Sequence, residues 1–124
     1  MMNRFKNYWA AFQRQQHLYL FWQQRTLFYR DCASALEEKE LLQDFIAGEL
    51  LIASQALTAN RARAKGLAYI QEVMQAGDLN LQQILTRSMP ASDAVALSTL
   101  RFANNIPEAL RELANNLDQQ SQMN

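Results

Sequence analysis

The sequence predicts an all-α fold, and two observations lead to this prediction. Residues that break helices are scarce, because the 124 residues include three glycines and two prolines, while helix-favouring Ala, Leu, Gln, Glu and Arg are frequent. No segment shows the alternation of Val, Ile and Thr with polar residues that is typical of strands. A chain of this length can bury a core as one domain without a metal or a disulfide.

The first helix of the predicted domain spans residues 18–36. Its apolar face consists of residues at helical intervals, which are Leu18, Phe21, Phe28, Cys32 and Ala35. The charged residues 37–40 connect it to a second helix, which begins at about residue 41. The predicted inner side of that helix comprises Leu41, Phe45, Gly48, Ile52 and Ala56. On this side Gly48 lacks a side chain and would let another helix come close.

A break at Thr58, Ala59 and Asn60 separates the second helix from a third, because Thr58 and Asn60 are both suitable N-caps. The apolar pattern alone would also allow one long helix over residues 41–76. The third helix spans residues 60–75, and Gly77 is a suitable C-cap. Its inward residues are Leu67, Ile70 and Met74.

Three further helices follow. Asn80 and Gln83 form a capping-box pattern at the start of the fourth helix, which ends at Met89-Pro90. Its inward residues are Leu81, Ile84 and Leu85. The fifth helix begins near residues 91–93 and ends at Asn104-Asn105. Its inward residues are Ala96, Leu97, Leu100 and Ala103.

The sixth helix begins after Asn105, with Pro107 in its first turn and Glu108 at the capping-box position. Its apolar residues are Ile106, Leu110, Leu113 and Leu117. Short connections favour antiparallel neighbours, so we expect a compact six-helix bundle made of two groups of three antiparallel helices. The predicted division is a basic, aromatic helical segment at residues 1–17, the bundle at 18–120, and a frayed tail at 121–124.

Charge and aromatic residues are concentrated at the start of the chain. No acidic residue precedes Asp31, and nine of the twelve aromatic residues lie before that position. Such asymmetry indicates a basic surface that faces an acidic partner. Nucleic acid is not expected as that partner, because the formal net charge of the whole chain is zero.

The N-terminal segment therefore contains the candidate partner- or membrane-binding residues, which are Arg4, Phe5, Lys6, Trp9, Phe12 and Arg14. Together with Tyr8, its aromatic residues follow helical spacing, and cations that flank aromatic rings suit the headgroup region of a membrane. Alternatively, these rings fold back on the bundle and extend its core.

No catalytic, cofactor or metal site is predicted. His17 is the only histidine and Cys32 the only cysteine, and no carboxylates stand at a recognisable spacing from them. We expect His17 at the surface near a helix start, and Cys32 in the core because it lies on an apolar face. No apolar run approaches the ~20 residues that a membrane span requires.

Three stretches of the sequence resemble the cytoplasmic domain of the type II secretion F-protein family, which includes the inner-membrane platform proteins of type IV pili. Residues 28–36 (FYRDCASAL) are similar to the motif of its first helix. Residues 75–79 (QAGDL), followed by Ile84-Leu85, resemble its glycine turn and short helix. Met89-Pro90 and residues 105–114 (NIPEALRELA) resemble its closing section. The resemblance covers residues 18–119, in the order of the predicted helices.

The chain departs from the family pattern at three places. Glu38-Lys39 replaces the glycine that ends the family's first helix, and Cys32 replaces a leucine. Leu100-Arg101 stands where the family has a Gly-Glu pair, so a carboxylate that binds a cation in some relatives is an arginine here, and no metal site is transferred. These departures indicate a divergent branch, such as a platform protein of a type IVb pilus.

The resemblance implies a non-catalytic scaffold domain at the cytoplasmic face of the bacterial inner membrane. Its partners would be the assembly ATPase and other inner-membrane assembly proteins, with a transmembrane segment following this chain and with homodimers as a further expectation. A free-standing helical adaptor or chaperone of a secretion system is an alternative with the same composition. A peripheral membrane protein that binds through its N-terminal segment is another.

Overall fold

The computed structural model describes residues 2–55 and 60–123, without the side chains of residues 2, 3, 5 and 123. This part of the chain is helical and contains no strand, which confirms the predicted fold class. It forms seven α-helices where six were predicted, and a 3-10 turn lies on either side of the sixth. The α-helices are α1 (Met2–Gln23), α2 (Arg25–Glu37), α3 (Leu42–Ser54), α4 (Arg61–Gln75), α5 (Leu81–Ser88), α6 (Ala94–Ser98) and α7 (Ile106–Met123).

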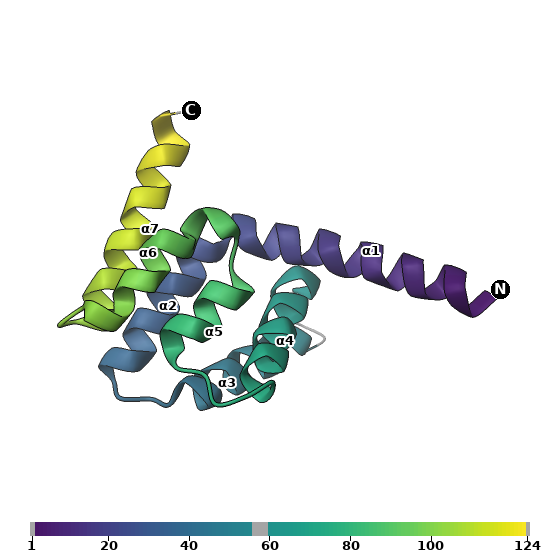
Figure 1. Ribbon diagram of the computed structural model, residues 1–124, viewed down its shortest axis with the longest axis horizontal. Helices are drawn as coiled ribbons and strands as arrows, with labels where there is room; N and C mark the ends of the chain where they lie inside the picture. Colours follow the sequence, from purple (N-terminus) through teal and green to yellow (C-terminus); the bar gives the residue numbers. More distant parts are fainter. Residues whose placement is uncertain (1, 56–59, 124) are drawn as a thin grey trace.

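The helices of the two halves of the chain pack against each other rather than forming two separate groups. Helix α7 lies along α2, while α4 contacts α1, α3 and α5, and α5 contacts α6. The N-terminal part of α1 extends away from the body formed by the other helices, and the C-terminal end of α7 also projects (Figure 1).

The prediction of one continuous helix over residues 18–36 is wrong, because the structure divides this segment at Gln24. Helix α1 ends at Gln23 and α2 begins at Arg25, so α1 crosses the predicted boundary between residues 17 and 18 without a break. The Gln24 amide donates to the carbonyl of Phe21, and no side chain caps α2 at this point. A residue from far away in the sequence, Asp93, contacts the chain just after this turn.

Asp93 is buried, with 2% of its surface exposed, and it anchors the turn between α1 and α2. Its carboxylate accepts hydrogen bonds from Arg25 Nε (2.6 Å), Arg25 Nη2 (3.1 Å) and the Tyr29 hydroxyl (2.7 Å). Arg25 Nη1 also donates to the carbonyl of Trp22 at 2.9 Å, near the end of α1. Burial, together with the hydrogen bond to Asp93, raises the pKa of Tyr29, so its hydroxyl remains a donor.

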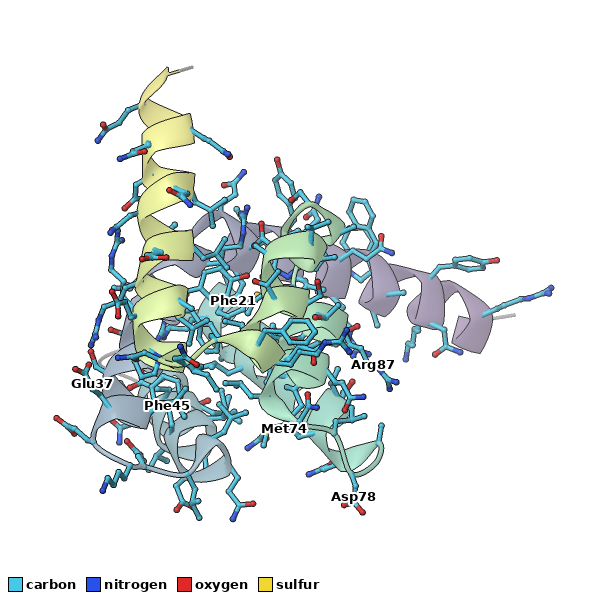
Figure 2. The ribbon with its side chains drawn as sticks, turned by 60° about the vertical axis from the view of Figure 1, so that its left-hand side comes forward. Phe21, Glu37, Phe45, Met74, Asp78 and Arg87 are labelled. Carbon is cyan, nitrogen blue, oxygen red and sulfur yellow. The ribbon has the colours of Figure 1, made fainter. Side chains whose placement is uncertain are left out.

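Aromatic side chains from three helices fill the centre of the body. The ring of Phe28 lies 5.6 Å from that of Phe21 and 6.0 Å from that of Phe45, between centroids. In Figure 2, Phe21 and Phe45 point into the interior, while Glu37 lies at the edge. Gly66 of α4 lies directly against the ring of Phe21, so that a Cβ atom at this position would overlap the ring. The glycine that permits close packing is therefore Gly66.

Of the described residues predicted for the inner face of the second helix, Phe45 alone is buried, so the rest of this prediction is wrong. Leu41, Gly48 and Ile52 are exposed, and nothing lies within 4 Å of a Cβ built on Gly48. The buried residues of α3 are Phe45, Ile46 and Ala53. Since apolar residues occur on nearly every side of α3, periodicity alone does not determine which side faces α4. Ala56, assigned to the same face, lies outside the described residues.

The predicted N-caps are confirmed. Asn60 accepts from the amide of Arg63 at 3.0 Å, Asn80 and Gln83 form a reciprocal capping box, and Asn105 accepts from the amide of Glu108 at 3.1 Å. The break before Asn60 is thus real, although Thr58 and Ala59 lie outside the described residues. Leu67 and Ile70 are buried and Met74 packs against the core, as predicted.

The predicted C-cap at Gly77 is wrong. Ala76 ends α4 in a right-handed conformation, and no described glycine has a positive φ. The left-handed position belongs to Lys39 (φ 63°), after the end of α2. There the Lys39 amide donates to Leu36 and the Glu40 amide donates to Ala35, which closes the helix as a Schellman motif. Lys39 thus adopts the conformation for which a glycine is usual.

Two further predictions about the second half of the chain need correction. The fifth predicted helix consists of three short pieces, which are a 3-10 turn at Ala91–Asp93, helix α6 and a second 3-10 turn at Thr99–Phe102. Leu97 and Leu100 are buried as predicted, but Ala96 is exposed. Helix α7 continues to Met123, and the fraying of the tail at 121–124 stays a prediction.

Replacement of the buried anion tests the role of the turn. We expect Asp93→Ala to lower the free energy of unfolding by about 3–5 kcal/mol, because it leaves the Arg25 guanidinium partly buried without its counter-charge. Asp118→Ala is the matched control, since Asp118 pairs with Arg30 at the surface and its loss should cost about 1 kcal/mol or less. Urea denaturation followed by circular dichroism measures both. Equal losses would show that Asp93 has no special role.

Two glycine substitutions test the close approach of α1 and α4. Gly66→Ala should destabilise the protein by about 1–3 kcal/mol, because the buried Phe21 ring must move. Gly48→Ala should stabilise it by about 0.5–1 kcal/mol, because alanine favours a helix interior and the site is open. The two variants should therefore shift the urea midpoint in opposite directions. A shift of the same sign in both would contradict this packing.

Candidate interaction surface

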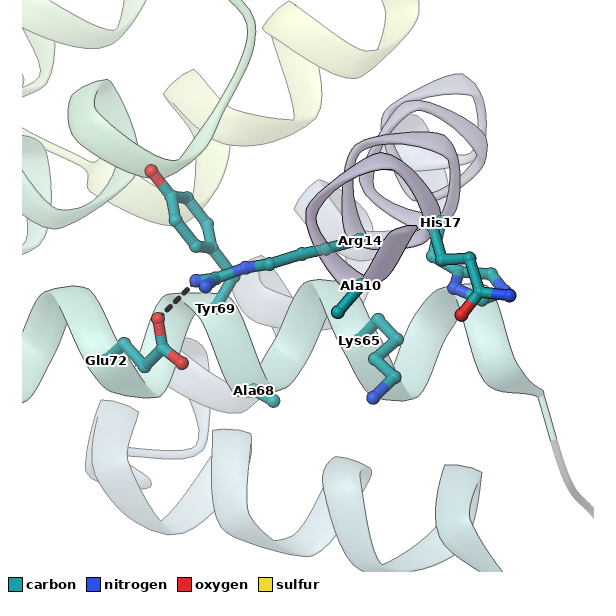
Figure 3. A pocket seen from close by; sticks show the side chains of 8 residues that line it. Ala10, Arg14, His17, Lys65, Ala68, Tyr69 and Glu72 are labelled. Carbon is teal, nitrogen blue, oxygen red and sulfur yellow. Dashed lines mark hydrogen bonds and ion pairs between the residues drawn. The ribbon is translucent and has the colours of Figure 1, made fainter. Parts of the chain in front are cut away.

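One face of α1 packs against α4, and a groove runs between these two helices. The groove has a volume of about 330 Å³. Its principal lining residues are Ala10, Arg14 and His17 of α1 together with Lys65, Tyr69 and Glu72 of α4 (Figure 3). This face of α1 is consequently not available to a large partner.

Arg14, one of the predicted binding residues, is engaged in this groove. Its guanidinium forms an ion pair with Glu72 and lies 5.3 Å from the centroid of the Tyr69 ring. Figure 3 shows the side chain extending from α1 across the groove to α4. The structure therefore separates Arg14 from the other candidate residues and gives it a role in fixing α1 to the body.

His17 also faces the groove rather than the open surface. It lies within α1, far from the start of that helix, and its side chain is half-buried. Its Nδ1 atom is buried and has no hydrogen-bond partner in the described part of the chain. The prediction of a surface histidine near a helix start is therefore wrong.

The opposite face of α1 is an exposed row of large apolar residues, which we call the aromatic stripe. It comprises Tyr8, Trp9, Phe12, Tyr19 and Leu20. Their exposed fractions range from 47% for Leu20 to 73% for Tyr8, which is unusual for so many large apolar side chains on one helix. The rings of Trp9 and Phe12 stack with centroids 5.9 Å apart. The alternative in which these aromatic residues extend the core is wrong for Tyr8, Trp9 and Phe12.

Two of the predicted cations lie beside the aromatic stripe. Arg4 stands one helical turn before Tyr8, and Lys6 stands three residues before Trp9, so the two cations flank opposite edges of the stripe. Both are exposed, and neither forms an ion pair within the described residues. The side chain of Phe5 lies outside the described part of the structure.

The sequence prediction missed Tyr19 and Leu20, and it left Tyr8 out of the binding residues. The signal was present, because Tyr19 follows Phe12 by seven residues, which is two helical turns. The predicted domain boundary between residues 17 and 18 divides this row of residues. A shallow hollow of about 410 Å³ lies between Phe12, Tyr19 and Leu20 and continues the stripe.

Several arginines of the body join helices to one another. Arg63 of α4 bridges Asp31 of α2 and Glu49 of α3 at 3.3 and 3.2 Å, and Arg30 of α2 contacts Asp118 of α7 at 2.6 Å. These contacts stabilise packing between helices, whereas Arg4 and Lys6 form no such contact within the described residues. No group of three His, Cys, Asp or Glu side chains able to hold a metal occurs among the described residues.

Cys32 lies in the core, as its place on an apolar face predicted. The thiol is completely buried, and burial together with the charge of Asp31 raises its pKa to about 12. At neutral pH the group is therefore a protonated, inaccessible thiol, which behaves as a small apolar side chain.

Within the described residues, no helix has both the length and the apolar character needed to cross a membrane. Comparison with known proteins finds no matching family model, no similar curated protein and no similar solved structure.

The buried thiol makes a further prediction. With a pKa of about 12 instead of the ordinary 9.0, the thiolate fraction of Cys32 at about pH 8 is roughly a thousandfold lower than that of a free thiol. A thiol reagent should therefore react only as fast as the protein opens, and rapidly in concentrated urea. The unfolded thiol ionises from about pH 9 while the folded one does not, so the free energy of unfolding should decrease between about pH 9 and 12. Fast labelling of the folded protein would contradict this burial.

Proposed function

We propose that this chain is a non-catalytic scaffold domain of a bacterial inner-membrane platform protein for type IV pilus assembly or type II secretion. The domain would work at the cytoplasmic face of the membrane and bind the assembly ATPase and other inner-membrane assembly proteins. The likeness of residues 28–36, 75–85 and 105–114 to motifs of this family supports the proposal, and the all-helical fold is compatible with it.

One structural observation supports a binding role most strongly. The charges inside the body pair across helices, whereas the large apolar residues of the aromatic stripe are exposed on a helix that extends from the body (Figure 1). Exposed apolar rows of this kind mark interaction sites. The alternative, a free-standing helical adaptor or chaperone of a secretion system, is supported by the same observation.

Binding to the assembly ATPase tests the proposal. We expect the purified chain to bind the assembly ATPase of a type IV pilus or type II secretion system from the same organism, and to change its rate of ATP hydrolysis. Asp93→Ala serves as the control for a disrupted fold, and a secretion ATPase from an unrelated system controls for specificity. The reading frame beyond Asn124 should continue into a hydrophobic span of ~20 residues. Absence of both binding and such a span would reject the platform proposal and favour the adaptor.

A further inference from the structure

We propose that the aromatic stripe of α1 binds side-on to an anionic lipid surface, with Arg4 and Lys6 contacting the headgroups. The inference goes beyond the scaffold proposal, because it depends on α1 alone and would also hold for a free-standing adaptor.

The charge of α1 matches an anionic surface. The first acidic residue of the chain is Asp31, so α1 contains no carboxylate. Arg4 and Lys6 flank the stripe, whereas the remaining arginine of this helix, Arg14, is neutralised by Glu72 on the opposite face. An amphipathic helix with aromatic residues on one side and cations at its edges places the rings among acyl chains and the cations among phosphates.

The shape of α1 also matches a flat surface. From Tyr8 to Leu20 the stripe runs for about 18 Å along one side of a continuous helix. The helix extends outward from the body (Figure 1), and α4 covers its other side. Trp and Tyr, which begin the stripe, are the side chains that favour the interface between water and lipid.

A second copy of the chain is a poorer occupant of this face. If two stripes paired in parallel, the Arg4 and Lys6 side chains of both copies would lie near one another, and if they paired antiparallel, these cations would lie beside the C-terminal end of the other copy's α1. Since α1 has no acidic residue, it would offer these four cations no counter-charge. Like charges at an interface oppose association, whereas a surface of lipid phosphates neutralises them.

Vesicle binding tests the inference directly. The chain is mixed with vesicles of phosphatidylglycerol and phosphatidylcholine, and with vesicles of phosphatidylcholine alone, and sedimentation measures the bound fraction. We expect binding to the anionic vesicles that weakens with added salt. Replacing Arg4 and Lys6 by glutamine should weaken it roughly 30-fold, and Trp9→Ala with Phe12→Ala should weaken it by more than about tenfold.

Matched controls separate the stripe from surface charge and aromatic content in general. Arg61→Gln with Arg87→Gln removes two exposed cations elsewhere, and Phe102→Ala removes an exposed aromatic ring outside α1. Both should bind as the unchanged chain does. Circular dichroism and a thermal melt establish that each variant remains folded.

Tryptophan fluorescence locates the contact. The chain has two tryptophans, and Trp22 is already engaged in a hydrogen bond to the Ser88 carbonyl at 3.0 Å. A blue shift on vesicle addition should therefore come from Trp9. In Trp9→Phe this shift should vanish while sedimentation with vesicles persists, because the ring is retained.

Three results would overturn the inference. The first is no binding to anionic vesicles at low salt, and the second is equal binding by the stripe variants and the unchanged chain. The third is that the unchanged chain does not bind vesicles but forms a dimer in solution, and that the double variant Trp9→Ala with Phe12→Ala dissociates this dimer. That result would assign the stripe to a contact with a second copy. If the chain binds anionic vesicles but not the ATPase, the scaffold proposal is rejected and the lipid proposal stands. If it binds the ATPase but not the vesicles, the lipid proposal is rejected and the scaffold proposal stands.

Discussion

The hydrogen-bonded ion pair between Arg25 and Asp93 is the constraint on which the arrangement of the helices depends. A buried carboxylate requires compensating donors, and Arg25 and Tyr29 supply them within two turns of α2. Because Arg25 and Tyr29 lie four residues apart on one face of α2, both donors reach the same carboxylate and fix the rotation of α2 relative to Asp93. Arg25 also donates to the Trp22 carbonyl in the last turn of α1, so one side chain contacts both helices beside the turn at Gln24.

Further contacts fix the direction of α1. At its C-terminal end the indole of Trp22 donates to the Ser88 carbonyl of α5 and Phe21 packs against Gly66 of α4, while farther along Arg14 pairs with Glu72 of α4. These contacts hold α1 against α4 and α5. The opposite side then has no element of the described chain to cover it, which is why the aromatic stripe is exposed.

Local features of the sequence predicted local structure well, and long-range features could not be predicted from it. The caps at Asn60, Asn80 and Asn105 depend on neighbouring residues, and each was predicted correctly. Beside the turn at Gln24, Arg25 pairs with Asp93, which lies 68 positions away, and no local pattern contains that information. The prediction places Arg14 on the binding surface because the sequence shows its neighbours on the same helix. It does not show that a carboxylate of another helix, Glu72, lies within reach of Arg14.

The composition of α1 is explained better by an external partner than by folding. Helix N-termini favour acidic residues, because the helix dipole is positive there, and a cation in the first turn costs about 0.3–1 kcal/mol. The first turn of α1 contains no acidic residue and includes Arg4. Tyr8, Trp9 and Phe12 are exposed, and each has a lower helix propensity than alanine, so they stabilise an isolated helix less than alanine would. Since both features reduce the stability of the free helix, a contact that uses aromatic rings and cations together, such as an anionic lipid surface, accounts for their presence.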